Sequence, residues 1–200
     1  VMSTHEVVLC HPVRTAIGTY GGSLKDMAAP DVGAIAIRDT LKRSGLAADK
    51  VQTLVMGNVI QAGVKMNPAR QAGIAAGLPV EVPALTVNRV CGSGAQGVAS
   101  AALEIWSGMV DCAIAGGMEN MDRAPYLLPQ GRWGARMGDV TMFDSMLVDG
   151  LHDAFSGKHS GWHTEDLVTK CGVSREDQDR WALRSQQRFS AAQAAGKFDA

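Results

Sequence analysis

The sequence predicts an α/β fold, built on a mixed, mostly parallel sheet with helices on both faces. From about residue 6 to residue 118, short apolar runs alternate with segments of helical periodicity. Glycine is abundant, at 23 residues, whereas aromatic residues make up only 5% of the chain. This combination favours closely packed α/β layers over a β-sandwich.

The expected strands are apolar runs rich in β-branched residues, bounded by polar residues or glycine. They cover residues 7–10, 54–60, 84–88 and 112–117. The expected helices open at a proline, an N-cap or a glycine and close at a glycine. They cover residues 30–45, 67–77 and 92–108. Cys10 and Cys112 fall within strands, so we expect both thiols to be buried.

The alternation of predicted strands and helices ends after Met118. Residues 121–139 are rich in Pro, Gly, Arg and Met and predict a long loop, followed by short helices near 144–151 and 165–170. Ser174 and Asp177 resemble a capping box that opens a last amphipathic helix. We therefore expect a core over residues 1–120 and a second, incomplete part over 121–200. Nothing after the last helix closes a sheet, so truncation or cleavage of a longer chain is also expected.

Composition excludes several classes of protein. The net charge of −1 gives no general attraction to nucleic acid or to anionic membranes. No apolar run has the length of a membrane span, and no secretory signal is evident, so we expect a cytoplasmic protein. The four cysteines lack metal-site spacing and are interpreted as free thiols, and no metal or cofactor is expected.

Cys91 is the candidate catalytic residue, a nucleophile at the junction of a predicted strand and a predicted helix. Free N–H groups and the helix dipole at such a junction favour a thiolate and can stabilise an oxyanion. Gly92 and Gly94 leave room for a substrate beside the backbone. The alternative is a buried structural cysteine in a turn. A dinucleotide site is another reading of the Gly92-x-Gly94-x-x-Gly97 pattern, but the only acidic residue near the next strand end is Glu119.

The segment Asn88-Arg89-Val90-Cys91-Gly92-Ser93-Gly94 resembles the nucleophile motif of the thiolases. Further stretches resemble thiolase motifs in the same order along the chain, and they are 12–18, 57–59, 67–72, 115–121, 137–139, 149–155 and 174–179. A Gly-x-His-x-Gly stretch at Gly157–Gly161 is most similar to the acetyl-CoA acetyltransferase branch.

This resemblance implies the thiolase fold, in which two βαβαβαββ halves stack around a layer of helices. Residues 1–120 would form the N-terminal βαβαβαβ half, and residues 121–200 the beginning of an inserted lid domain. The implied activity is an acyl transfer. Two acyl-CoA molecules, such as acetyl-CoA, condense to acetoacetyl-CoA, or a 3-ketoacyl-CoA undergoes the reverse thiolysis. The reaction is ping-pong through an acyl-Cys91 thioester, with coenzyme A thioesters as substrates rather than as cofactors.

The remaining groups of this chemistry belong to the second half of a thiolase. The family takes a second cysteine, a histidine and an asparagine from motifs resembling Cys-x-Gly-Gly-Gly, Gly-His-Pro and Asn-Glu-Ala-Phe, none of which occurs here. Cys171 is no substitute, because only Gly172 follows it. We therefore expect a C-terminal thiolase half as a separate or cleaved chain, and a homo-oligomer, dimer or tetramer, of complete units.

The resemblance also suggests substrate-binding residues. Leu151 and His159 match positions that line the channel for the pantetheine arm of CoA. Ser160 stands where the acetoacetyl-CoA-type enzymes have methionine, so a branched, longer or more polar acyl group is also compatible. Glu119 is interpreted as a supporting hydrogen-bonding group, and the resemblance gives His163 no role.

Two further readings remain open. A ketoacyl synthase that uses an acyl carrier protein would share the cysteine on a similar helix. A thiolase-like partner subunit without catalysis would share the fold but leave Cys91 unreactive.

Overall fold

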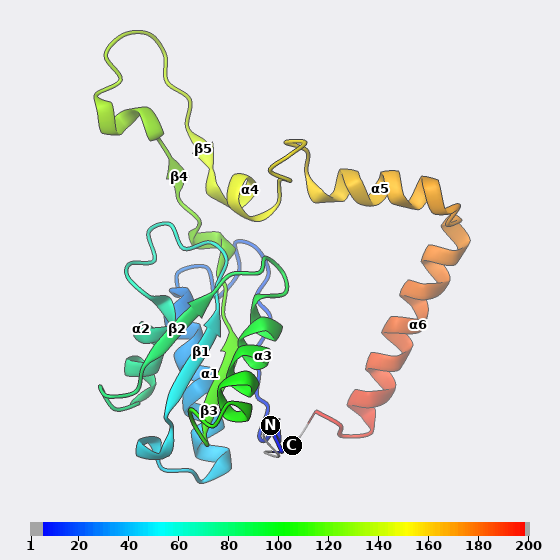
Figure 1. Cartoon of the computed structure of the whole chain (residues 1–200). Coiled ribbons are helices and arrows are strands. Elements are labelled where there is room, and N and C mark those ends of the chain that lie inside the picture. The colour runs from blue at the N-terminus through cyan, green and yellow to red at the C-terminus, as the bar shows by residue number, and fades with distance from the viewer. Residues whose placement is uncertain (1–5, 199–200) are drawn as a thin grey trace. The chain divides into compact units, whose positions relative to one another are not determined.

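The computed structural model describes residues 6–198, and these residues divide into two compact units (Figure 1). The first unit runs to Leu151 and the second begins at His152. The elements of the first unit are α1 (Ala29–Ser44), β1 (Thr53–Gly57), α2 (Pro68–Ala76), β2 (Ala84–Val87), α3 (Ser93–Trp106), β3 (Ala113–Gly117), β4 (Tyr126–Leu127), β5 (Phe143–Asp144) and α4 (Ser145–Gly150). Those of the second unit are α5 (Ser160–Cys171) and α6 (Arg175–Ala194).

The main sheet of the first unit is parallel, with strand order β2-β1-β3. In this register Leu54 of β1 lies opposite Ala84 on one side and Ile114 on the other. Every residue of β1 is buried, as expected for a central strand covered on both faces. The α/β class with a parallel sheet is confirmed.

Successive residues of β1 meet different helices, because side chains alternate across a strand. Leu54 packs toward Gly73 of α2, and it belongs with Met56 to the apolar core shared by α1 and α2. Gly57 lies against Ser93 of α3 instead. The sheet is therefore covered on both faces, by α1 and α2 on one and by α3 on the other (Figure 1).

The helix ends follow the capping signals in the sequence. The Asn67 side chain accepts a hydrogen bond from the Arg70 amide at 3.2 Å, which caps α2. Gly45 and Gly77 end α1 and α2 in the left-handed region, with φ of 67° and 96°, respectively. The predicted bounds of these helices are confirmed to within a residue or two.

The prediction of a strand at residues 7–10 is wrong. This segment has no regular structure, and Cys10, expected to be buried, is exposed. A strand needs a neighbouring strand for its backbone N–H and C=O groups, and no described strand pairs with this segment. The first strand of the expected βαβαβαβ order is therefore absent among residues 6–198, and β1 is the strand predicted second.

Residues 121–151 contain more regular structure than the predicted loop. The short strands β4 and β5 pair antiparallel, and the buried Ser145 donates its hydroxyl to the Pro125 carbonyl at 2.6 Å. Short 3₁₀ turns occur at Ala48–Lys50, Met121–Arg123 and Pro129–Trp133. The chain divides into its two compact units after residue 151, and the predicted core boundary near residue 120 stays a prediction.

The second unit consists of two helices and the loops before them. Ser174 accepts a hydrogen bond from the Asp177 amide at 3.1 Å, which confirms the predicted cap of α6. Helix α5 begins at Ser160, earlier than the predicted residue 165, because His159 caps it. Neither helix has a buried residue. Among the described residues, no helix is long and apolar enough to cross a membrane.

Candidate active site

Cys91 lies in the turn between β2 and α3, at the carboxyl edge of the parallel sheet, and its side chain is exposed. Ligands of open α/β sheets bind at this edge. Val90, directly before it, has φ of +48°, which is rare for a β-branched residue. Such backbone strain persists only where surrounding contacts hold it.

Hydrogen bonds on both sides of Val90 hold the turn. The Asn88 side chain accepts from the Val90 amide at 2.9 Å. The buried Ser93 hydroxyl accepts from the Arg89 amide at 2.8 Å and donates to the Val90 carbonyl at 2.6 Å. The backbone that presents Cys91 is thus fixed by short-range contacts within the turn.

The first turn of α3 leaves few free donors. The amides of Gly92 and Ser93 donate to the Arg89 and Val90 carbonyls, each at 3.0 Å. The amides of Gly94 and Ala95 have no hydrogen-bond partner within residues 6–198. These two N–H groups, with the helix dipole, form a positive end to α3 near Cys91.

Glycines allow α3 to come this close to the sheet. A Cβ atom at Gly57 would lie 2.4 Å from the Ser93 carbonyl carbon, so only glycine fits there. A Cβ atom at Gly117 would lie 3.0 Å from the Gly94 Cα. Close backbone packing therefore sets the start of α3, and with it Cys91, against the ends of β1 and β3.

Asn58 and Glu119 form a second polar group at the same edge of the sheet, just beyond β1 and β3. Glu119 accepts hydrogen bonds from the Asn58 side chain and the Val59 amide, each at 2.8 Å. Burial raises the pKa of the Glu119 carboxyl, although these hydrogen bonds oppose the shift. Asn58 Oδ1 is buried and has no partner among the described residues. The contacts of Glu119 agree with its interpretation as a supporting hydrogen-bonding group.

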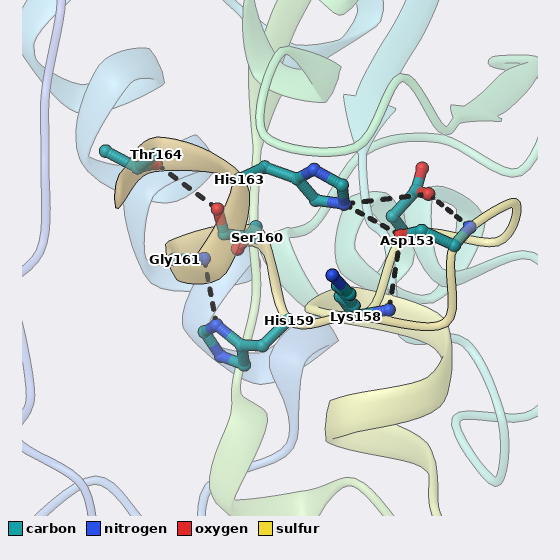
Figure 2. Close-up of polar contacts among 8 residues, drawn as sticks. Asp153, Lys158, His159, Ser160, Gly161, His163 and Thr164 are labelled. Atoms are coloured by element: carbon teal, nitrogen blue, oxygen red, sulfur yellow. Dashed lines mark hydrogen bonds and ion pairs between the residues drawn. The ribbon is translucent and has the colours of Figure 1, made fainter. Parts of the chain in front are cut away.

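The other predicted site residues lie further along the chain. Leu151 is half-buried at the end of α4, where its amide donates to the Leu147 carbonyl at 3.0 Å. His159 and Ser160 belong to the second unit, as the N-cap and first residue of α5 (Figure 2). His159 Nδ1 accepts from the Gly161 amide at 3.0 Å, which leaves Nε2 as the ring nitrogen that can donate.

The sequence did not predict a polar cluster before and within the first turn of α5, which we call the Asp153–Ser156–His163 cluster. Figure 2 shows its Asp153 and His163 side chains. Ser156 Oγ and His163 Nε2 are 2.7 Å apart, and the same Nε2 is 3.8 Å from Asp153 Oδ2. Hydrogen bonds from Ser156 lower the pKa of the Asp153 carboxyl, and the charge of His163 adds to this. The Asp-x-x-Ser spacing could have predicted the turn, whereas the contact with His163 depends on how α5 folds back.

Within residues 6–198, no group of three or more His, Cys, Asp or Glu side chains could hold a metal ion.

The described residues form an α/β protein that presents an exposed cysteine at the carboxyl edge of a parallel sheet. Residues 7–200 match the family described as thiolase, N-terminal domain, and the chain therefore belongs to the thiolase family. The resemblance seen in the sequence motifs is confirmed.

Curated relatives carry related names. The chain is 47% identical over 194 residues to an acetyl-CoA acetyltransferase of Cupriavidus necator, covering 97% of this chain and 49% of that protein. It is 46% identical over 192 residues to an acetyl-CoA acetyltransferase of Allochromatium vinosum, covering 96% and 49%. It is also 47% identical over 193 residues to a probable acetyl-CoA acyltransferase of Staphylococcus aureus, again covering 96% and 49%. The chain spans about half the length of these relatives.

Proposed function

We propose that this chain carries the nucleophile of a thiolase-type acyltransferase, and that Cys91 accepts the acyl group. The Cys91 thiolate attacks the thioester carbonyl of an acyl-CoA, the bond from that carbonyl to the CoA sulfur breaks, and CoA leaves as its thiol after taking a proton. A base then takes an α-proton from acetyl-CoA, and the resulting carbanion attacks the carbonyl of acyl-Cys91. The bond from that carbonyl to the Cys91 sulfur breaks, which releases a 3-ketoacyl-CoA and regenerates the Cys91 thiolate. Thiolysis is the same sequence in reverse.

The observation that carries this proposal is the exposure of Cys91 beside the free amides at the start of α3. A helix N-terminus stabilises an anion by roughly 0.3–1 kcal/mol. Enzymes lower reaction barriers by roughly 8 kcal/mol or more, so α3 alone supplies a small part of the catalysis. The base and the donors that stabilise the carbanion of acetyl-CoA must come from other groups.

We place those groups on a C-terminal thiolase half, supplied by the same protein or by a separate chain. Two facts support this: the chain covers 49% of its curated relatives, and the Gly-His-Pro and Cys-x-Gly-Gly-Gly motifs of the family are absent from it. In this proposal Leu151 and His159 line the pantetheine channel, and Ser160 borders the acyl group. Complete units would associate as a homo-oligomer.

The experiment is acylation of Cys91 in the complete protein by acetyl-CoA, read by intact mass and peptide mapping. We expect one acetyl group on Cys91, and none on the Cys91→Ser variant. Iodoacetamide at neutral pH provides an independent measure of reactivity. Cys10 and Cys171 are also exposed and serve as internal controls, so we expect Cys91 to react at least about tenfold faster.

Equal labelling of the three cysteines and no acetyl transfer would contradict the proposal and favour a non-catalytic partner subunit. Acylation from an acyl carrier protein but not from CoA would favour a ketoacyl synthase. Turnover with a series of 3-ketoacyl-CoA thioesters then defines the acyl preference set by Ser160.

A further inference from the structure

The Asp153–Ser156–His163 cluster lies in a small hairpin that ends at His159. His152 and His159 form an antiparallel bridge, and within it the Asp153 amide donates to the Lys158 carbonyl at 2.9 Å. The Asp153 carboxylate closes the tip by accepting from the Ser156 amide at 2.7 Å. Because the hairpin ends where α5 starts, His159 stands at the junction of the two elements.

His163 joins these two elements across the junction. It lies in the first turn of α5 and its ring points toward Asp153 (Figure 2). Its Nε2 is 2.7 Å from Ser156 Oγ at the hairpin tip. The Asp153 carboxylate next to the same nitrogen favours a proton on Nε2, which then donates to Ser156 Oγ. This contact ties the hairpin to α5, and His159 lies between them, with its Nδ1 accepting from the Gly161 amide of α5 at 3.0 Å.

We propose that His163 is a positioning residue that holds His159 in its orientation toward the thioester substrate. The inference rests on the proposed function, because it takes His159 as a substrate contact. His163 would act on binding of the CoA thioester through the hairpin, and it would have no part in the chemistry at Cys91.

A hydrolytic Ser-His-Asp triad does not fit the same cluster. In a triad the serine and the carboxylate contact opposite nitrogens of the imidazole. Here Ser156 and Asp153 both approach Nε2. Ser156 Oγ also accepts from the Lys158 amide at 3.3 Å, as part of the turn. The geometry is that of a structural clamp.

The test uses steady-state kinetics of the complete enzyme with His163→Phe, which keeps a ring but removes the polar atoms. We expect KM for the acyl-CoA to rise about 3- to 10-fold, the range that one ordinary hydrogen bond gives, with kcat within about twofold. His163→Gln, which keeps a side-chain N–H group of similar reach, should restore most of the lost affinity. Ser156→Ala should raise KM similarly, and the double variant no further.

Thr164→Val is the matched control. Thr164 is the next residue of α5, and its hydroxyl donates only to the Ser160 carbonyl of the same helix, at 3.2 Å. We expect this variant to leave KM unchanged. If Thr164→Val raises KM as much as His163→Phe, or if the effects of Ser156→Ala and His163→Phe add, the inference is overturned. Acylation of wild-type Cys91 is measured separately. Its absence would contradict the proposed function, whereas the KM comparisons test the role of His163.

Discussion

At the scale of single residues, the Asn58–Glu119 pair shows how a partly buried carboxyl is kept near the Cys91 turn. Glu119 receives hydrogen bonds from the Asn58 side chain and from the backbone, and Asn58 also donates to the Met118 carbonyl at 3.2 Å. Burial is nevertheless the largest influence on the Glu119 carboxyl, and it raises the pKa. The carboxyl is therefore harder to ionise in the folded protein than in the unfolded chain.

This shift predicts a pH dependence of stability. The folded-state pKa of Glu119 is raised above its ordinary value of 4.5. The stabilisation that the protonated carboxyl gives the folded state is therefore fully present below pH 4.5. The contribution is lost as pH rises through the folded pKa. Glu119→Gln cannot titrate, so the free energy of unfolding of the wild type minus that of the variant should decrease as pH rises above 4.5. Urea unfolding of both proteins between pH 4.5 and 7.5 measures this difference, and a constant or increasing difference would contradict it.

The position of Cys91 could be predicted from sequence because it depends on local signals. The apolar run before Asn88 and the glycines after Cys91 place a turn there. The pairing of Asn58 with Glu119 could not be predicted, because 61 residues separate them and only the parallel register of β1 and β3 brings them together. The Ser156–His163 contact was missed for a related reason, since the predicted helix began after His163.

At the scale of elements, the placement of α3 depends on the absence of side chains. Gly57 of β1 faces α3, and Gly97 of α3 faces the sheet. A Cβ atom at Gly97 would lie 2.9 Å from the Gly116 carbonyl oxygen. The nearest atoms, the Ser93 carbonyl carbon for Gly57 and the Gly116 carbonyl oxygen for Gly97, belong to the backbone and cannot move aside as a flexible side chain could. The distance between α3 and the sheet is therefore set by glycine, and the Cys91 turn depends on that distance.

A pair of glycine variants tests this packing. Gly57→Ala places a methyl group 2.4 Å from the α3 backbone and should lower the free energy of unfolding by about 1–3 kcal/mol. It should also slow the proposed acylation of Cys91, because the turn must move. Gly94→Ala is the control: its methyl group would lie 3.7 Å from Gly117, and alanine is a better helix former by ~1 kcal/mol. Urea unfolding measures both variants. Equal losses in the free energy of unfolding would show that the close approach at Gly57 does not cause the loss.

Helix ends were the most predictable elements, and the first strand was the least. Asn67, Gly77 and Ser174 act within a few residues of their own position, so their sequence signals suffice. The apolar run at 7–10 has the composition of a strand, but pairing requires a partner elsewhere in the chain. Composition cannot show whether that partner is present.

At the scale of the whole molecule, the two compact units differ in what stabilises them. All buried apolar residues of the described chain lie in the first unit, and most of them form the core shared by the sheet, α1 and α2. In the second unit large apolar side chains are exposed, including Trp181 at 68% and Phe189 at 55%. Its helices rely on capping and on short-range pairs such as Arg184 over the Trp181 ring, 4.0 Å from the centroid.

Hydrogen–deuterium exchange should reveal this difference in the chain of 200 residues. Isolated helices are marginal in water, since most helix stability comes from tertiary packing. We therefore expect the amides of α5 and α6 to exchange at least about a hundredfold faster than those of β1, which open only with the core. In the complete enzyme with CoA bound, α5 should gain protection if its first turn contacts the thioester as proposed. Protection of α6 equal to that of β1 in this chain alone would mean that the second unit is stabilised by more than its own caps and short-range pairs.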